Sequence, residues 1–337
     1  MDLELVLQSS ISQEKEENNV LKNGATYTRR WPASPLRNNS IFHIRKLTTL
    51  FFGYVTSIII EPHHVLWREN MTNMEIQLVK AELCQRVIDA VRPFEGESRK
   101  EIQDFYRIST TWSSNAIEGN TLTMGETKVL LEDGITIGGK PLKDTLEAFG
   151  HAEAYDYMFS LMRNAQVALD DILELHRLFY HKISEKDAGI YRNTQVRITG
   201  SETILPTPKE IPSRMKQLEL WMRENEKTLK PLVYAAELYR RFVEIHPFKD
   251  GNGRTARLLM NTALIQNGYL PCVISPAIRL DYLQSLEASH DTPARGGDPD
   301  RFIAFVAEAE TETEKDFIRS MHLEMPDFKH ELENMER

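Results

Sequence analysis

Apolar residues recur at every third or fourth position along most of the chain from residue 74 onward, which predicts amphipathic helices. The first pattern covers 74–93 and the second covers about 98–115. Thr123 and Glu126 have the spacing of a capping box, so a third helix is predicted to begin there and to end near Gly134. Further helices are predicted over 141–162, 170–183, 208–224, 231–245, 254–266, 278–289 and 299–315.

One segment breaks this helical pattern. Residues 189–206 alternate between apolar and polar positions and carry β-branched residues on both sides of Gly200 and Ser201. This pattern predicts a short β-hairpin. An isolated hairpin is only marginally stable, so it has to pack on the helices. The predicted fold class is therefore an all-α bundle with one small hairpin.

The N-terminal residues differ from the rest of the chain. Residues 47–60 are an uncharged, largely apolar run. The run is shorter than the roughly 20 residues that a membrane span needs. It also lies too far from Met1 for an ordinary signal peptide. Three interpretations stay open for this region: a membrane anchor, an accessory element packed on the core, and an extension that the fold does not need. The last is favoured.

Composition and charge narrow the class of protein. Of the 337 residues, 41% are hydrophobic and 27% are charged, which is ordinary for a soluble globular protein. The net charge of −9 argues against a nucleic-acid partner bound by broad electrostatic attraction. Cys84 and Cys272 lie far apart in the sequence, and no Cys/His cluster indicates a zinc site or a disulfide framework. A reducing cytoplasm is the expected location.

Candidate chemistry is concentrated in residues 246–257, which read HPFKDGNGRTAR. The turn Gly251-Asn252-Gly253 precedes a predicted helix, and a turn of this kind presents several backbone N–H groups to an anion. Arg254 and Arg257 are three positions apart on that helix, so they are expected on the same side. Guanidinium groups suit phosphate oxygens. The turn and the arginines together predict a phosphate-binding site.

Two further side chains complete this candidate site. The carboxylate of Asp250 can hold a hard cation such as Mg²⁺. The imidazole of His246 titrates near neutral pH and can take a proton from a hydroxyl group. With the phosphate-binding turn, these residues predict a site that transfers part of a nucleoside triphosphate.

The same stretch resembles the signature of the Fic family, H-P-F-x-[D/E]-G-N-G-R-x-x-R, at every fixed position. The resemblance implies a Fic-type helical bundle with a β-hairpin flap at 189–206, and ATP and Mg²⁺ as cofactors. It implies transfer of AMP from ATP to a Ser, Thr or Tyr hydroxyl of a target protein. His246 would be the general base and Arg257 would hold the γ-phosphate. By the same resemblance, Asn261 and Tyr282 are candidates for the adenosine pocket.

Residues 114–120 resemble the inhibitory motif of the same family, [S/T]-x-x-x-E-[G/N]. Ser114 and Glu118 are four positions apart and share one helix face. The resemblance implies that Glu118 pairs with Arg257 and thereby occupies the place of the γ-phosphate. The chain is therefore similar to the Fic class whose inhibitory helix precedes the catalytic core.

The sequence leaves two other functions open. The same site could remove AMP from a modified protein as a phosphodiesterase, or the chain could be a non-catalytic nucleotide-binding regulator. The resemblance implies two kinds of partner: a target protein with a hydroxyl side chain, and a second copy of the chain in a homodimer. Four regions are predicted: an N-terminal extension (1–73), helices carrying the inhibitory motif (74–135), the catalytic core (136–316) and a C-terminal tail (317–337).

Overall fold

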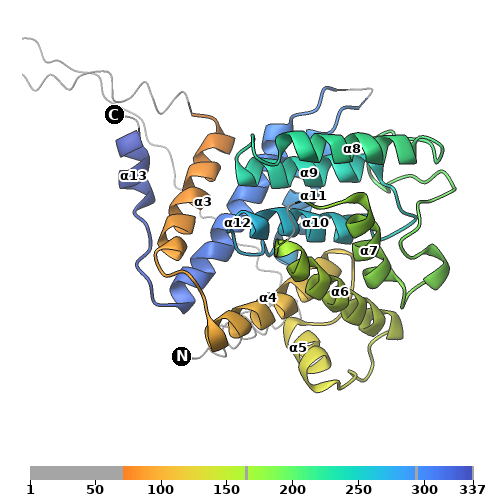
Figure 1. Ribbon diagram of the computed structural model, residues 1–337, viewed down its shortest axis with the longest axis horizontal. Coiled ribbons are helices and arrows are strands. Elements are labelled where there is room, and N and C mark those ends of the chain that lie inside the picture. Colours follow the sequence, from red (N-terminus) through yellow and green to blue (C-terminus); the bar gives the residue numbers. More distant parts are fainter. Residues whose placement is uncertain (1–70, 164–165, 293–294, 336–337) are drawn as a thin grey trace, which may run out of the picture.

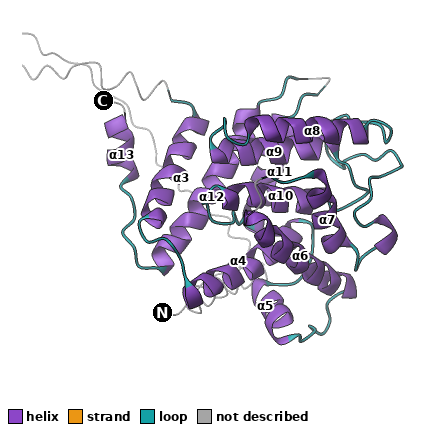
Figure 2. Cartoon of the chain, in the orientation of Figure 1, coloured by secondary structure: helices purple, strands orange, loops and turns teal. Residues whose placement is uncertain are grey.

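The structure is a computed structural model that describes residues 71–163, 166–292 and 295–335. The apolar run at 47–60 lies outside the described residues. Within the described ranges the chain forms helices and loops and no β-strand (Figure 2), which confirms the all-α fold class. The α-helices are α3 (Asn73–Asp89), α4 (Gly96–Ile117), α5 (Met124–Asp133), α6 (Leu142–Ser160), α7 (Leu169–Tyr180), α8 (Ile211–Asn225), α9 (Pro231–Ile245), α10 (Asn252–Gln266), α11 (Arg279–Ser289), α12 (Pro299–Ser320) and α13 (Phe328–Met335).

The observed helix bounds follow the predicted ones closely. Helix α9 spans 231–245, as predicted. Thr123 caps α5, because its side chain accepts from the N–H of Glu126 at 3.2 Å while the Glu126 carboxylate accepts from the N–H of Thr123 at 2.8 Å. Helix α12 extends beyond its predicted end to Ser320, because Phe317 in its last turns is still buried. Among the described helices, none is long and apolar enough to cross a membrane.

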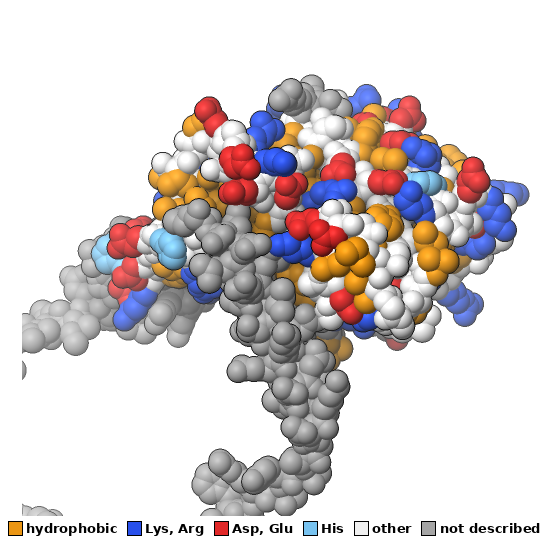
Figure 3. Space-filling view, turned by 90° about the horizontal axis from the view of Figure 1, so that it is seen from below, with side chains coloured by type: hydrophobic (Ala, Val, Ile, Leu, Met, Phe, Trp, Pro, Cys, Tyr) orange, Lys and Arg blue, Asp and Glu red, His pale blue; other side chains and the backbone are white. Residues whose placement is uncertain are grey.

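Helix α10 lies at the centre of the bundle (Figure 1). It packs against α9 on one side and against α4, α6 and α7 on the others. Almost every residue of α10 is buried, so its two ends are held in place by the surrounding helices. Helix α12 connects this bundle to α3, with which it packs along most of its length. On the face shown in Figure 3, acidic and basic side chains are interspersed with apolar ones.

The hairpin predicted for 189–206 is not formed. This segment is a loop, and no backbone ladder joins its two arms. A single turn is present at its tip, where the N–H of Ser201 donates to the carbonyl of Ile198 at 3.2 Å. A side chain connects the arms instead: Arg192 donates through Nη2 to the carbonyl of Pro206 at 2.7 Å.

The reason is that alternation alone does not fix strand pairing. A strand register is well specified only when one face of the pair is buried. Here Ile190 and Ile204 remain 57% and 76% exposed, so the alternating apolar residues do not share a buried face. The prediction of strands in this segment is therefore wrong, although the segment does turn back on itself.

Two carboxyl groups are buried where α12 packs against α3. Glu310 and Glu314 lie one turn apart on α12, are fully buried, and accept no hydrogen bond of normal geometry. Burial raises the pKa of Glu310 to about 8, and the opposing effects of the Cys272 thiol and Arg92 do not cancel it. Burial, with Glu310 as a second cause, also raises the pKa of Glu314 well above its usual value. These groups therefore oppose folding when they are ionised.

Replacing Glu310 by glutamine is expected to change how the melting temperature depends on pH. The folded-state pKa is raised, so the unfolded chain loses its proton first and wild-type stability falls as pH rises from about 4.5 to about 8. The melting temperature of Glu310→Gln minus that of wild type should therefore grow by about 7–15 °C between pH 5 and pH 8.5. Glu312→Gln, on an exposed position of α12, is the control in differential scanning fluorimetry. A difference that stays constant with pH would contradict this prediction.

Candidate active site

His246 ends α9 in a left-handed backbone conformation, with φ of 48°. This conformation turns the chain into the loop that leads to α10. Arg192 fixes the turn, because its N–H donates to the carbonyl of Pro247 at 2.8 Å and its Nε donates to the carbonyl of His246 at 2.8 Å. From the other side, the ring of Phe248 stacks on His176 with centroids 3.7 Å apart. The unusual conformation of His246 is therefore imposed by contacts on both sides of the loop.

The imidazole of His246 is neutral at neutral pH. Burial lowers the pKa of His246 to about 4, and Arg192 acts in the same direction. The carbonyl of Val243 and the carboxylates of Asp250 and Glu118 oppose this shift without reversing it. A neutral imidazole is the protonation state that can accept a proton from a hydroxyl group.

The loop before α10 is closed by a single asparagine. The N–H of Phe248 donates to Oδ1 of Asn252 at 2.9 Å, and Nδ2 of Asn252 donates back to the carbonyl of Phe248 at 2.9 Å. Gly251 has φ of 77°, and a Cβ there would lie 2.8 Å from Cε1 of Phe179, so both the conformation and the space require glycine. No side chain caps the N-terminus of α10. The N–H groups of its first turn are thus available to an anion.

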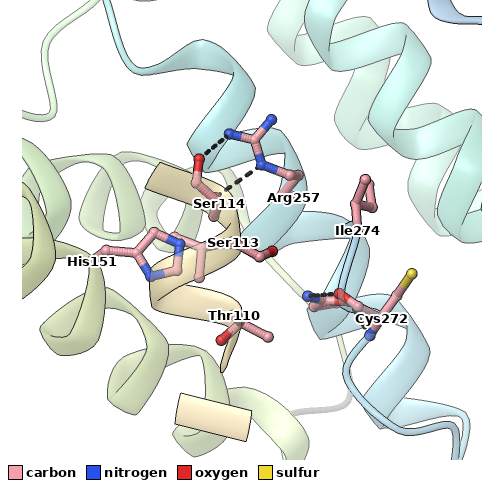
Figure 4. Close-up of a pocket in the computed structure, with 9 residues that line it drawn as sticks. Thr110, Ser113, Ser114, His151, Arg257, Cys272 and Ile274 are labelled. Carbon is pink, nitrogen blue, oxygen red and sulfur yellow. Dashed lines mark hydrogen bonds between the residues drawn. The ribbon is translucent and has the colours of Figure 1, made fainter. Parts of the chain in front are cut away.

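The structure brings Glu118 and Arg257 into contact. Nη2 of Arg257 donates to Oε1 of Glu118 at 2.8 Å. Arg257 is held on two other sides as well, and Figure 4 shows the side formed by Ser114. Its Nε donates to Oγ of Ser114 at 2.9 Å, its Nη2 donates to the carbonyl of Ser114 at 2.8 Å, and its Nη1 donates to the hydroxyl of Tyr282 at 3.2 Å. The predicted residues Ser114 and Glu118 therefore both bind Arg257.

The carboxylate of Glu118 also lies against the first turn of α10. A Cβ placed on Gly253 would be only 2.6 Å from Oε1 of Glu118. Burial acts to raise the pKa of Glu118, but Arg257, with help from Arg254, holds it below its usual value, so the group is ionised at neutral pH. A carboxylate thus occupies the position where the helix N-terminus favours an anion.

Asp250 presents a half-exposed carboxylate beside this position. Its Oδ1 accepts from the N–H of Gly251 at 2.7 Å, and its Oδ2 accepts from the hydroxyl of Tyr180 at 3.3 Å. The part of the chain that the structure describes contains no group of three His, Cys, Asp or Glu side chains that could hold a metal ion. Mg²⁺ bound to a nucleotide typically takes one or two carboxylates in addition to phosphate oxygens. A single carboxylate therefore fits an ion that arrives with the nucleotide.

Comparison with known proteins identifies the domain around this site. Residues 166–264 match the model of the Fic/DOC family. The chain contains a Fic domain. A curated relative from Nematostella vectensis, named protein adenylyltransferase Fic, is 36% identical over 226 residues, which cover 66% of this chain and 51% of the relative. The relative of the same name from Drosophila melanogaster is 34% identical over 241 residues, covering 71% of this chain and 47% of the relative.

The chain thus spans about half the length of the curated relatives it matches. A solved structure of a fragment of Fic-1 from C. elegans has a TM-score of 0.65 and 29% sequence identity with this chain, and the match covers 73% of each chain. The helical architecture of the Fic domain is therefore shared with a solved structure that is related in sequence.

Arg254 of the Fic domain has a partner that the sequence does not reveal. Its Nη1 donates to Oε1 of Glu147 at 2.7 Å, and both side chains are about 95% buried, with 4% and 5% exposed. The guanidinium lies over the ring of Phe179, 4.3 Å from its centroid. Arg254 and Arg257 are thus bound to different carboxylates, and no motif or spacing in the sequence marks Glu147.

The two residues predicted for the adenosine pocket are buried and already bonded. Asn261 binds the backbone of Cys272 twice, accepting from its N–H at 2.9 Å and donating to its carbonyl at 3.2 Å. The cavity that Asn261 borders has room for about one water molecule (Figure 4). The hydroxyl of Tyr282 binds Arg257 and Tyr239. In this structure both residues hold other parts of the Fic domain in place, and contact with adenosine stays a prediction.

Proposed function

We propose that this chain is a protein adenylyltransferase, which transfers AMP from ATP to a Ser, Thr or Tyr hydroxyl of a target protein and is restrained by its own Glu118. The observation that carries the proposal is the ionised Glu118 carboxylate on Arg257, in front of the uncapped first turn of α10. A carboxylate in that position marks an anion site built to bind phosphate. The names of the relatives support the choice of AMP as the transferred group.

In the proposed reaction, the N–H groups of Gly253 and its neighbours in the first turn of α10 bind the phosphates of ATP, and Arg257 neutralises the terminal phosphate. Asp250 would hold Mg²⁺, which neutralises charge on the phosphate oxygens. The neutral His246 takes the proton of the target hydroxyl while the hydroxyl oxygen bonds to the α-phosphorus of ATP. The bond from that phosphorus to pyrophosphate breaks, and pyrophosphate leaves.

Glu118 restrains this reaction by competition. The terminal phosphate of ATP and the Glu118 carboxylate are both anions, and both require Arg257. ATP can bind in the productive position only when Glu118 leaves Arg257. The resting chain is therefore expected to transfer AMP slowly.

A second candidate function is removal of AMP from a modified protein at the same site. The Glu118 carboxylate is ionised and its side chain is 36% exposed, so it could orient a water molecule towards a bound AMP ester. A non-catalytic regulator is disfavoured, because His246 and Asp250 would then have no purpose at the site.

Mass spectrometry of the purified chain tests this proposal. Wild type and Glu118→Gly are incubated with ATP and Mg²⁺, alone and with a cell lysate, and their peptides are searched for AMP on hydroxyl side chains. AMP on the chain or on a lysate protein supports the proposal, and its absence from all proteins contradicts it. Incubation of an isolated AMP-modified product with both variants tests the second candidate, since loss of AMP only with wild type would favour it.

A further inference from the structure

Glu147 binds two different elements with its two carboxylate oxygens. It lies on α6, and its side chain is 5% exposed. Its Oε1 accepts from Nη1 of Arg254, in the first turn of α10, at 2.7 Å. Its Oε2 accepts from Nδ2 of Asn120, in the turn that follows α4, at 3.0 Å. Lys143, an exposed residue one turn earlier, lies 3.4 Å from Oε1. One buried carboxylate therefore joins the phosphate-binding end of α10 to the turn beside Glu118.

That turn, residues 115–120, is hereafter called the brake turn, because it carries Glu118. Both of its ends meet the Glu147–Arg254 pair. At one end, Oδ1 of Asn115 accepts from Nη1 of Arg254 at 3.5 Å, and its Nδ2 donates to the carbonyl of Glu147 at 3.5 Å. At the other end, Asn120 has a fixed orientation, because its Oδ1 accepts from the N–H of Leu122 at 3.0 Å. Its Nδ2 must therefore face Glu147.

We propose that Glu147 is a positioning residue that couples the brake turn to Arg254, so that the restraint by Glu118 and the affinity for ATP depend on the same buried carboxylate. This inference rests on the proposed function and explains how Glu118 is held in position beside the first turn of α10. A carboxylate suits this position because both of its oxygens accept hydrogen bonds.

Glutamine at this position offers only one acceptor. In Glu147→Gln, the amide N–H₂ must face either Arg254 or Asn120, and both of these are donors. One of the two contacts is lost, and Arg254 also loses its buried charged partner. Loss of the Asn120 contact loosens the brake turn, in which Asn120 then keeps its bond to the carbonyl of Asp144 at 3.0 Å. Loss of the Arg254 contact weakens the binding of phosphate.

A double-mutant cycle between Glu118→Gly and Glu147→Gln measures the coupling. With Glu118 present, Glu147→Gln is expected to raise AMP transfer, because the brake turn is less firmly held. With Glu118 replaced by glycine, Glu147→Gln is expected to lower transfer, through a KM for ATP that rises more than kcat falls. The two effects should differ by about 3- to 30-fold. Glu153→Gln, on a more exposed position of α6, is the matched control, and melting curves verify that every variant folds.

Equal proportional effects of Glu147→Gln in the two backgrounds, or no effect in either, would overturn the inference while leaving the proposed function intact. Asn120→Ala provides a second test. It removes the contact with Glu147, together with the bonds to the carbonyl of Asp144 and the N–H of Leu122, and leaves the Glu147–Arg254 pair. With Glu118 present, Asn120→Ala should raise AMP transfer. With Glu118 replaced by glycine, it should leave the KM for ATP unchanged. A raised KM in the glycine background would also count against the coupling. If Glu118→Gly transfers no AMP at all, the proposed function fails. The coupling is then tested with the same double-mutant cycle, in which isothermal titration calorimetry measures the affinity of each variant for ATP.

Discussion

Glu118→Gly is expected to increase the rate of AMP transfer by about 10- to 100-fold over wild type. A hydrogen bond to a charged group contributes about 1.5–3 kcal/mol, and that contribution is what ATP has to overcome in order to reach Arg257. The substitution should leave the site otherwise intact, because Ser114 and Tyr282 continue to hold Arg257. Initial rates with labelled ATP, at concentrations below the KM, measure the effect.

Glu118→Gln is the matched control for this prediction. It keeps the size of the side chain and its hydrogen-bonding oxygen but removes the charge, so its rate should lie between those of wild type and Glu118→Gly. The affinity for ATP should increase in the same order. A rate for Glu118→Gly no higher than that of wild type would show that the contact with Arg257 does not restrain AMP transfer.

His246→Ala in the Glu118→Gly background is expected to reduce AMP transfer by about 10²- to 10⁴-fold, the usual contribution of a general base. ATP binding should persist, because in the proposed reaction the phosphate contacts come from α10 and Arg257 and not from His246. Residue 246 has a left-handed backbone conformation, which is unfavourable for alanine by about 1–2 kcal/mol. Some loss of stability is therefore expected in His246→Ala, and it has to be separated from the loss of the base.

His246→Asn makes this separation, since asparagine tolerates the left-handed conformation better than alanine but is not a base. Both variants should lose transfer equally, although only His246→Ala should melt at a lower temperature. Full activity in His246→Asn would remove His246 from the role of base. Calorimetric titration with ATP verifies that both variants still bind the nucleotide.

The low pKa of His246 also predicts the pH dependence of the proposed AMP transfer. The acid limb of kcat/KM reports the free enzyme. Since the pKa of His246 is lowered to about 4, the base stays unprotonated down to that pH. The Glu118→Gly variant should thus retain kcat/KM as the pH falls from 7 to about 5, provided that circular dichroism shows it folded at each pH. An acid limb centred near the ordinary histidine value of about 6.5 would contradict this expectation.

The features that the sequence predicts well are those decided by near neighbours in the chain. The capping box of Thr123 and Glu126 involves residues three positions apart, and the start of α9 at Pro231 follows from the fixed φ of proline. The contact of Glu118 with Arg257 connects distant residues, and it was predictable only because both lie in motifs that resemble those of a known family.

The features that the sequence did not predict depend on tertiary packing. Glu147 looks like an ordinary polar residue of an amphipathic helix, and only the meeting of α6 with α10 makes it the partner of Arg254. The loop at 189–206 has a strand-like pattern, but the guanidinium of Arg192 connects its arms in place of a ladder. In both places a long polar side chain satisfies groups from segments far apart in the sequence, and no local pattern encodes such contacts.

The several hydrogen bonds of Arg257 have a consequence for the proposed activation. When Glu118 leaves, the Arg257 guanidinium is still bound by Ser114 and Tyr282, so its position does not change. Under the proposed function, activation requires Glu118 to leave Arg257, and Arg257 itself can stay in place. Release of the proposed restraint is therefore expected to need no rearrangement of the helices around Arg257.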